Sequence, residues 1–393
     1  MRTAFVISAL AFIVPALGAP TIIPITKRAG PVKSNSYIVQ LKDGVASDSS
    51  LAMLKRKLAP GSSITYNYAP LWNGFAATLN NDGLKFVQRM SEVALIEQDS
   101  IRSLAEYEDN SALGDISPAV EHYPELVGRA ETSGGSGKGA IIYGIDTGIY
   151  TQHNCFGGRA KPGKSFVDVM VMGESDTNDG NGHGTHTAGT AVGKGYGIAQ
   201  YAIIVAVKVL NAQGSGPTSG VMAGIKWAYD DFKAGNKLAV ATMSLGGRDP
   251  LGQDTSIDKM VQNAIAGGLH FTIAAGNDGL DAGTTTPARV DEANTIGAVD
   301  MKNQRAYFSN FGPKIDVWAP GVNIKSAWIG KPDAENTISG TSMATPYVAG
   351  ILVNALDKYG SRTPAELSQD LKDHAKPVVT GGLTSNNLLA TPW

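Results

Sequence analysis

The sequence predicts an α/β protein in which a doubly wound parallel sheet follows a small α+β unit. Residues 36–104 show strand and helix patterns in the order strand, helix, strand, strand, helix, strand, which is the ferredoxin-like arrangement. From residue 140 onward, continuous apolar runs alternate with amphipathic helical stretches, and such runs are typical of parallel strands covered on both faces. A chain of 393 residues is long enough to bury a core in each unit.

The first residues are typical of a secretory signal peptide. Arg2 precedes an apolar run over residues 4–14, and Ala16-Leu17-Gly18 supplies the small residues that a signal peptidase requires. The run is too short for a membrane anchor, which needs about 20 apolar residues. We therefore expect residues 1–19 to be removed and the protein to be extracellular, with the vacuole as the alternative destination.

A propeptide-sized segment follows, from residue 20 to residue 105. Its linker carries a dibasic pair, Lys27-Arg28, that a processing protease could cut. Strands are predicted by SYIVQL (36–41), SITYNY (63–68), GFAATL (74–79) and VALIEQ (93–98), and helices by SLAMLKRKLA (50–59) and DGLKFVQRM (82–90). Between residues 106 and 139 the periodicity is lost and Ser, Gly, Pro and acidic residues increase, which indicates a domain boundary.

The second domain, residues 106–393, contains the parallel sheet. Its strands are predicted by AIIYGI (140–145), AIIVAVKVL (202–210), LAVATMSL (238–245) and FTIAA (271–275). Its helices are predicted by SGVMAGIKWAYDDF (219–232), SIDKMVQNAIAGG (256–268) and YVAGILVNALDKY (347–359). In such sheets, functional residues gather at the carboxyl ends of the strands.

Composition excludes several classes of partner. The 33 basic and 35 acidic residues nearly cancel to a net charge of -2, so no global field attracts nucleic acid or acidic membranes. The single cysteine, Cys155, rules out an intramolecular disulfide. We therefore expect stability to come from the core, from a metal ion, or from both.

Two motifs resemble binding sites but fit them poorly. GGSGKGA (134–140) has Gly139 after Lys138, where a phosphate loop has Ser or Thr, and it precedes a strand instead of following one. His183 and His186 have a spacing that zinc ligands can have, but a third ligand is missing nearby, since Cys155 is alone and His153 lies in another loop.

Three polar residues lie where catalytic groups are expected. Asp146 follows a buried strand and precedes a glycine turn, which by itself is equally typical of a cap. Ser342 lies where a glycine turn enters a helix, so backbone N–H groups and the helix dipole can stabilise an oxyanion there. A plain cap serine is the alternative, and the presence of Asp146, His183 and Ser342 together favours catalysis.

These motifs resemble those of a known enzyme family. DTG (146–148), GHGTH (182–186) and GTSMATP (340–346), in the order Asp, His, Ser, are similar to the three signatures of the subtilisin-like serine proteases. SLGG (244–247), AAGN (274–277), FSNFG (308–312) and APG (319–321) resemble the proteinase K branch, which includes fungal secreted alkaline proteases. The resemblance covers residues 106–393 as a peptidase S8 domain, and residues 36–104 resemble its inhibitory I9 propeptide.

The resemblance implies a catalytic role for each motif. Ser342 is the expected nucleophile, His183 the general base acting through Nε2, and Asp146 the group that holds the other ring nitrogen. The glycines around His183 are expected to leave room for substrate, and His186 is expected to pack. Asn277 is the expected oxyanion donor, together with the backbone N–H of Ser342.

The resemblance also implies a substrate cleft. Two extended segments would hold a peptide between them as an added strand, and since main-chain pairing reads no side chain, we expect broad specificity. The two segments are Gly214, Ser215 and Gly216, and Ser244, Leu245 and Gly246. The pocket for the residue before the scissile bond would be walled by Ala274, Ala275 and Gly276. The small wall residues suggest a pocket open to large apolar or aromatic groups. The expected partners are polypeptide substrates and the chain's own propeptide, acting as inhibitor and folding aid, in a monomer.

Calcium is the cofactor that the resemblance implies, in a structural role, with none for catalysis. The ligands would be the carboxylate of Asp316 and the backbone carbonyls of Asp291 and Ala293, and an all-oxygen set suits a hard cation.

The chain departs from the family pattern at three positions, and two other functions stay open. Tyr347 stands where histidine is usual, Thr242 where asparagine is common, and Cys155 where relatives often have an acid. One alternative is an inactive relative that only binds, although all four catalytic positions are filled. Another is a lipase or esterase, although the G-x-S-x-G motif is missing and the triad order differs.

Overall fold

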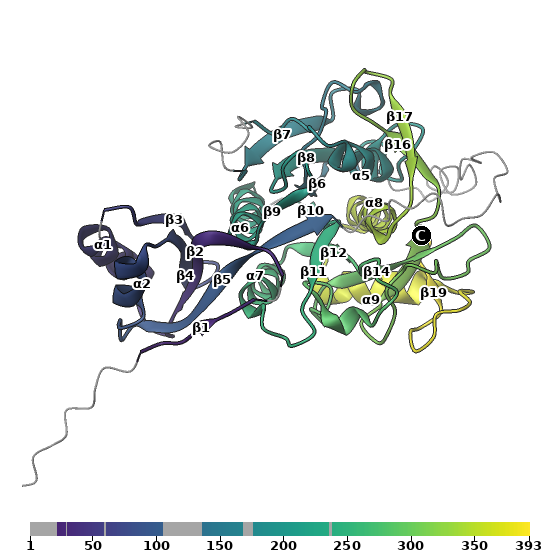
Figure 1. Cartoon of the computed structure of the whole chain (residues 1–393). Helices are drawn as coiled ribbons and strands as arrows, with labels where there is room; N and C mark the ends of the chain where they lie inside the picture. The colour runs from purple at the N-terminus through teal and green to yellow at the C-terminus, as the bar shows by residue number, and fades with distance from the viewer. Residues whose placement is uncertain (1–21, 29, 59, 105–135, 168–175, 236–237) are drawn as a thin grey trace, which may run out of the picture.

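The computed structural model describes residues 22–28, 30–58, 60–104, 136–167, 176–235 and 238–393. A smaller unit, up to residue 104, lies against one side of a larger unit that begins at residue 136 (Figure 1). The predicted signal peptide and most of the predicted boundary at residues 106–139 lie outside the described residues.

The smaller unit has the predicted ferredoxin-like order. It consists of β2 (Val32–Leu41), α1 (Ser47–Lys57), β3 (Ser63–Asn67), β4 (Gly74–Thr78), α2 (Asn81–Val87) and β5 (Val93–Leu104). The strands lie in the order β5-β2-β4-β3, and each neighbouring pair is antiparallel. Apolar side chains such as Val39, Phe75 and Ile96 form a core of their own in this unit. A short strand, β1 (Ile25–Thr26), pairs in parallel with β5.

The larger unit is built on the predicted parallel sheet. Its strands are β6 (Ala140–Asp146), β7 (Ala160–Ser165), β8 (Ile203–Lys208), β10 (Leu238–Met243), β12 (His270–Ala274), β14 (Asn294–Val299) and β15 (Val317–Pro320). They lie side by side in the order β15-β14-β12-β10-β6-β8-β7, all parallel, and β19 (Leu388–Leu389) and β18 (Lys376–Pro377) extend the β15 edge. The doubly wound prediction is therefore confirmed.

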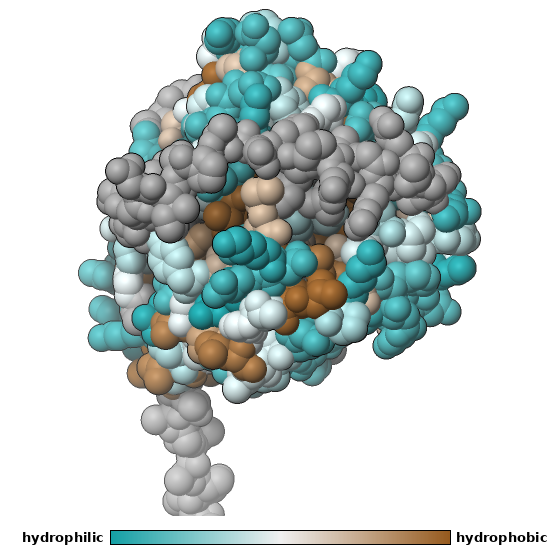
Figure 2. All heavy atoms as spheres, turned by 90° about the vertical axis from the view of Figure 1, so that its right-hand side faces the viewer, coloured by the Kyte–Doolittle hydropathy of each residue, from teal (hydrophilic) through white to brown (hydrophobic). Residues whose placement is uncertain are grey.

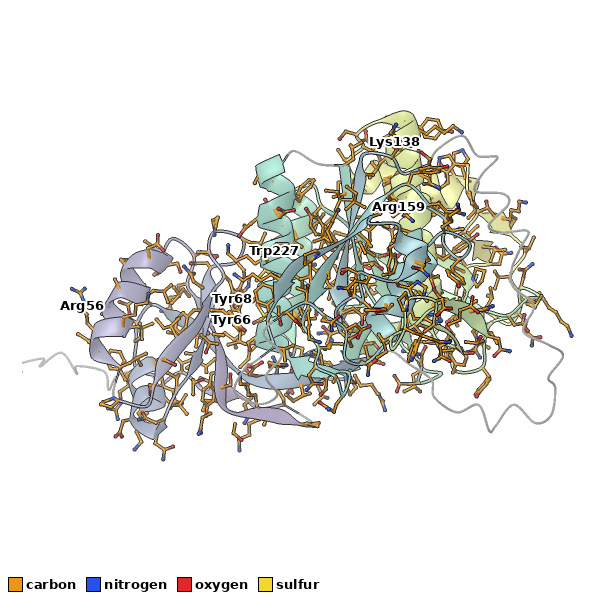
Figure 3. All side chains as sticks on the ribbon, turned by 90° about the horizontal axis from the view of Figure 1, so that it is seen from above. Arg56, Tyr66, Tyr68, Lys138, Arg159 and Trp227 are labelled. Carbon is orange, nitrogen blue, oxygen red and sulfur yellow. The ribbon has the colours of Figure 1, made fainter. Side chains whose placement is uncertain are left out.

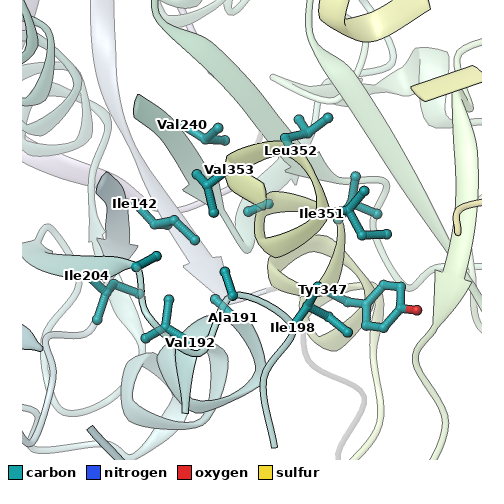
Figure 4. Packing of buried hydrophobic residues seen from close by; sticks show 14 of the residues in the cluster. Ile142, Ala191, Val192, Ile198, Ile204, Val240, Tyr347, Ile351, Leu352 and Val353 are labelled. Atoms are coloured by element: carbon teal, nitrogen blue, oxygen red, sulfur yellow. The ribbon is translucent and has the colours of Figure 1, made fainter. Parts of the chain in front are cut away.

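Helices cover both faces of this sheet and form a separate apolar core on each. On one face lie α5 (His183–Val192), α8 (Thr341–Tyr359) and α9 (Pro364–His374), and on the other α6 (Thr218–Gly235) and α7 (Thr255–Ala266). Figure 4 shows α8 packing its apolar side chains against Ile142 and Val240 of the sheet. This packing fixes the first turn of α8 at the carboxyl ends of the central strands.

Strand β7 was not predicted, because its sequence AKPGKS has neither an apolar run nor alternation. It lies at the edge of the sheet, where Pro162 can be accommodated because one side of an edge strand makes no ladder hydrogen bonds. A two-stranded hairpin, β16 (Ile324–Ala327) and β17 (Glu335–Ile338), packs next to α5. No helix in the described ranges is long and apolar enough to cross a membrane. On the face drawn in Figure 2, hydrophilic residues predominate.

The two units meet through polar contacts that are buried. Asp99 of β5 accepts hydrogen bonds from the backbone N–H and the hydroxyl of Ser219, at 2.9 and 2.6 Å, and from the hydroxyl of Ser36 at 2.7 Å. Ser219 lies in the first turn of α6, so the carboxylate caps this helix. Burial raises the pKa of Asp99, although its hydrogen bonds act in the opposite direction. Tyr68, labelled in Figure 3 on the side of the smaller unit that faces the larger one, donates a hydrogen bond to the Ser219 carbonyl oxygen at 2.9 Å.

The dibasic pair Lys27-Arg28, predicted as a possible processing site, lies where the two units meet. The side chain of Arg28 is 3% exposed and forms ion pairs with Glu97 at 2.9 Å and with Asp254 of the larger unit at 2.8 Å. A protease needs an extended, accessible segment, and while the two units are docked Lys27 is exposed but the Arg28 side chain is not available to it.

His270, the first residue of β12, gives stability a pH dependence. Burial lowers its pKa from about 6.5 to about 4, so between these values the unfolded chain binds a proton that the folded chain does not. We expect the free energy of unfolding to fall with decreasing pH across this window, by up to about 1.4 kcal/mol per pH unit from this residue.

Urea unfolding at several pH values, in a Ser342→Ala background that removes the predicted nucleophile, measures this contribution. His270→Gln should reduce the slope of stability against pH between pH 6.5 and pH 4. Equal slopes for both proteins would show that His270 titrates normally.

Candidate active site

Three predicted catalytic residues come from separate elements that meet at the carboxyl edge of the sheet. Asp146 is the last residue of β6, His183 the first of α5, and Ser342 lies in the first turn of α8. Asp146 is 3% exposed, and His183 and Ser342 are fully buried.

Asp146 holds one nitrogen of His183. The Asp146 Oδ1 atom lies 2.7 Å from His183 Nδ1, and the same carboxylate accepts hydrogen bonds from the backbone of Thr147 at 2.7 Å and the hydroxyl of Thr187 at 3.3 Å. Because a carboxylate only accepts, Nδ1 carries the hydrogen and the lone pair of the neutral ring lies on Nε2. This is the tautomer that a general base requires.

Ser342 is tied to the end of β10. Its hydroxyl donates to the carbonyl oxygen of Ser244 at 3.3 Å, and the Ser244 hydroxyl donates to the carbonyl oxygen of Ser342 at 2.9 Å. The backbone N–H of Ser342 belongs to the first turn of α8, where N–H groups have no acceptor within the helix. Such N–H groups can bind an oxyanion.

Asn277 follows β12, and two hydrogen bonds from Thr341 fix its side chain. Its side-chain oxygen accepts from the backbone N–H of Thr341 at 3.0 Å and from the Thr341 hydroxyl at 2.9 Å. These two bonds orient the amide, so its oxygen faces Thr341 and its NH2 group is the donating end.

Asn310 is a positioning residue that the sequence analysis missed. Its NH2 group donates to the Ala275 carbonyl at 2.8 Å, and its oxygen accepts from Asp278 at 3.1 Å, so it holds the loop that carries Asn277. Gly276 has a φ of +103°, and a Cβ atom there would lie 2.4 Å from the Asn310 amide nitrogen. The motif FSNFG contains this asparagine, but nothing local shows which loop it binds.

Asp179 is the second residue that was missed. Its buried carboxylate accepts from the hydroxyl of Thr147 at 2.8 Å, from the backbone of Gly182 at 2.9 Å, and from the backbone and hydroxyl of Thr185 at 2.8 and 2.6 Å. It therefore fixes the turn that leads into His183. An acidic residue shortly before a helix start is a capping signal that could have identified it.

The packing role expected for His186 agrees with the structure. Its Nε2 atom lies 2.9 Å from the Ile324 carbonyl oxygen, and burial lowers its pKa to about 3. The room expected for substrate beside His183 stays a prediction, but the two flanking glycines have another role. A Cβ atom on Gly182 would strike the ring of Trp328, and one on Gly184 would lie 2.2 Å from the Gly148 carbonyl oxygen. These glycines make room for the protein's own atoms.

The predicted cleft segments hold a strand of the smaller unit. The end of β5 lies antiparallel to β9 (Ser215–Pro217) and to β11 (Leu245–Arg248). Arg102 pairs with Gly216, Ser103 with both Ser215 and Gly246, and Leu104 with Leu245. The Leu104 N–H also donates to the Gly214 carbonyl oxygen at 3.1 Å. The C-terminal stretch of the propeptide, around residues 100–110, is expected to lie in the cleft as a poor substrate, and its part beyond residue 104 lies outside the described residues.

A cavity of about 250 Å³ opens next to Leu104. It is lined by Ser103, Leu104, Gly246, Gly247, Arg248, Ala274, Gly276, Asn277, Asp278 and Thr285. Ala274 and Gly276 thus form part of the wall, as predicted, but Ala275 does not, because its side chain packs in a separate apolar cluster. Arg248, Asn277 and Asp278 make the lining more polar than predicted.

The predicted calcium ligands lie close together but have protein partners. Asp316 accepts from the backbone N–H of Thr295 at 2.8 Å, and its other oxygen lies 2.6 Å from Lys372 Nζ. The side chain of Asp291 is exposed and pairs with Lys314, and Ala293 is buried beside them. In the part of the chain that is described, no group of three or more His, Cys, Asp or Glu side chains is arranged to hold a metal.

The three unusual residues are accommodated in the core. Tyr347 packs in the apolar cluster on the α8 face, near Ile198 (Figure 4). Thr242 is buried between strands and its hydroxyl is 3.1 Å from that of Thr272. Cys155 is buried, which raises the pKa of its thiol to about 12 and leaves it unreactive at neutral pH.

Comparisons with known proteins agree with this architecture. A model of the subtilase family matches residues 137–389, and one of the peptidase inhibitor I9 family matches residues 36–105. Subtilisin-like protease 8 of Trichophyton verrucosum is 35% identical over 95% of this chain and 86% of its own length. Subtilisin-like protease 2 of Pseudogymnoascus destructans is 38% identical over 86% of this chain and 84% of its own.

A solved structure is also similar. The crystal structure of a cold adapted subtilisin-like serine proteinase has a TM-score of 0.60 and 42% sequence identity, and the match covers 66% of this chain and 90% of that one. The chain therefore belongs to the subtilase family, as a serine-type endopeptidase with an I9 propeptide in front of its catalytic domain.

Proposed function

We propose that this chain is a secreted endopeptidase of broad specificity that uses Asp146, His183 and Ser342 and cleaves its own propeptide. The observation that carries the proposal is the bond between Asp146 and His183, which fixes the basic tautomer of a histidine at the same sheet edge as Ser342. Family membership favours peptide hydrolysis over the lipase alternative.

In the proposed reaction, Ser342 Oγ attacks the carbonyl carbon of the scissile peptide while its proton passes to His183 Nε2. Asp146 stabilises the imidazolium that forms. The attack leaves a negative charge on the former carbonyl oxygen of the substrate. This oxygen accepts hydrogen bonds from the Asn277 amide and the Ser342 backbone N–H. The C–N bond then breaks and Nε2 protonates the leaving amine, after which water releases the acyl group from Ser342 by the same steps in reverse.

Broad specificity is supported by the way in which β5 lies in the cleft. Its pairing with β9 and β11 uses backbone groups, which every peptide substrate offers. The signal-like residues 1–19 support secretion, with delivery to the vacuole as the alternative. We further propose that the mature enzyme acts as a monomer.

We also propose a structural calcium ion bound by Asp316 and the carbonyls of Asp291 and Ala293. A carboxylate and two carbonyls form an oxygen-only donor set, which fits a hard cation. Lys372 now supplies the positive charge beside Asp316, so an ion that binds there must displace its ammonium group.

Replacing Ser342 by Ala tests the catalytic proposal. The variant should accumulate as a precursor that still carries the propeptide, whereas the parent loses everything before about residue 105, because the first cleavage needs the nucleophile. N-terminal sequencing distinguishes the precursor from the mature protein, and casein hydrolysis measures the turnover.

The variant should also lose nearly all turnover, with the two units still together after purification. Ser361→Ala is the matched control, since it removes the hydroxyl of an exposed serine after α8, outside the cleft, and should leave processing intact. A mature N-terminus on Ser342→Ala protein from a protease-deficient host would mean that another protease makes the cut.

Chelation tests the ion. Removing calcium should lower the melting temperature and speed autolysis, because an ion that binds only the folded state stabilises it, by about 2.7 kcal/mol at a hundredfold excess over Kd. Asp316→Asn should abolish the response to calcium, and Lys372→Ala should enlarge it. If neither the chelator nor added calcium changes the melting temperature of the parent protein, the proposal is refuted.

A further inference from the structure

Arg102 is a buried cation in the part of β5 that lies in the cleft. Its side chain is 2% exposed. One guanidinium nitrogen, Nη2, lies 2.6 Å from Asp254 Oδ2, and Nε donates to the Thr218 hydroxyl at 2.9 Å. These two partners belong to the catalytic domain, with Thr218 at the start of α6 and Asp254 directly before α7, while a third, the Ser100 hydroxyl, accepts from Nη2 at 3.0 Å within β5 itself. A pocket in the catalytic domain therefore binds the side chain of a cleft-bound strand.

The strand register defines which substrate position this pocket serves. Arg102 pairs with Gly216 on one side of the cleft, and Leu104, two residues later, pairs with Leu245 on the other. If the chain is cut after about residue 105, as proposed above, Arg102 is the fourth residue before the scissile bond. A substrate in the same register places its fourth residue in the same pocket.

The charges around the pocket change when the propeptide leaves. Asp254 forms ion pairs with Arg28 and Arg102, and both arginines belong to the propeptide. The neighbouring carboxylates differ, because Asp249 and Asp258 both pair with Arg289 of the catalytic domain, at 2.8 and 2.7 Å. Among the described residues, the ion pairs of Asp254 are thus supplied by the propeptide alone. Its departure leaves a carboxylate beside the cleft without these cations.

The shape of the pocket favours arginine over lysine. Asp254 and Thr218 bind two different nitrogens of one planar guanidinium, and a single ammonium group cannot reproduce this spacing. Gly247 forms part of the wall, and a Cβ atom there would lie 2.6 Å from Arg102 Nη1. The missing side chain at Gly247 therefore makes the space that the guanidinium fills.

We propose that Asp254 and Thr218 form a substrate pocket that selects arginine at the fourth position before the scissile bond. The inference rests on the proposed function and narrows its broad specificity. Substrates would be polypeptides in which arginine precedes the cut by this distance. Asp254 is a specificity residue and takes no part in bond cleavage.

The test uses mature enzyme and a peptide with the sequence of residues 101–108, IRSLAEYE. A matched peptide carries citrulline in place of the arginine, which keeps the shape and removes the charge. The arginine peptide should have a kcat/KM at least about tenfold higher, which corresponds to about 1.4 kcal/mol, and mass spectrometry should locate the cut three residues after the arginine. A lysine peptide should fall between the two.

Asp254→Asn should make the kcat/KM values of the arginine and citrulline peptides nearly equal. It should do so by lowering the value for the arginine peptide and not the value for the citrulline peptide. Asp230→Asn is the control, since it removes an exposed negative charge from α6 and should leave the ratio unchanged. Because Asp254 also binds the propeptide, the variant can fail to mature. In that case the parent enzyme is used to digest a mixture of peptides derived from a proteome, and the cut sites are identified by mass spectrometry. Arginine should be enriched at the fourth residue before the scissile bond.

Equal cleavage of the arginine and citrulline peptides by the parent would overturn the inference. So would an arginine preference at a different distance from the cut. Failure of the mature enzyme to cleave casein and every peptide would overturn the proposed function itself, and the two failures are thus distinguishable.

Discussion

One strand, β5, belongs to both halves of this molecule. It pairs with β2 and β1 in the propeptide, and its last residues pair with β9 and β11 in the catalytic domain. The propeptide therefore occupies the predicted cleft segments as an added strand, held by main-chain groups. The position of the propeptide and the register in which it pairs with β9 and β11 both depend on this strand.

Burying polar groups at this contact is costly unless each finds a partner, and the two units provide complementary ones. Asp99 and Glu97 lie on β5 and accept hydrogen bonds from Ser219 and Thr255 at the starts of α6 and α7. Arg28 and Arg102 bind Asp254 in return. Separating the units breaks the contacts between them, so the contact is specific as well as stable. The proposed cut after about residue 105, just beyond β5, would remove the covalent link that keeps the partners at high effective concentration.

The sequence predicted the elements with strong hydrophobic patterns and missed what depends on distant partners. The apolar runs that became β6, β8, β10 and β12 were identified correctly, because strands buried on both faces have a clear signature. Strand β5 was expected to end near Gln98 but continues to Leu104. Its final residues, DSIRSL, carry charges that no isolated strand would bury, and their partners lie in the other unit.

The dependence on distant partners also explains which residues of the candidate active site could be predicted from the sequence. Asp146, His183 and Ser342 could be named from local motifs, and the structure brings Asp146 and His183 into contact. Asp179 and Asn310 act by fixing loops far away in sequence, and Arg28 looked accessible because its burial depends on Glu97 and Asp254. Local patterns identify reactive groups, whereas tertiary packing decides what orients or covers them.

Hydrogen exchange tests most directly whether β5 occupies the cleft as an added strand. It would be measured by mass spectrometry on Ser342→Ala precursor and on mature enzyme, for peptides that cover β9 and β11, with the hairpin β16-β17 as a reference outside the contact. Slower exchange of β9 and β11 in the precursor, with the hairpin unchanged, is the result that the structure predicts. Equal exchange of β9 and β11 in both proteins would contradict it, because an added strand cannot leave those amides as accessible as an open cleft does.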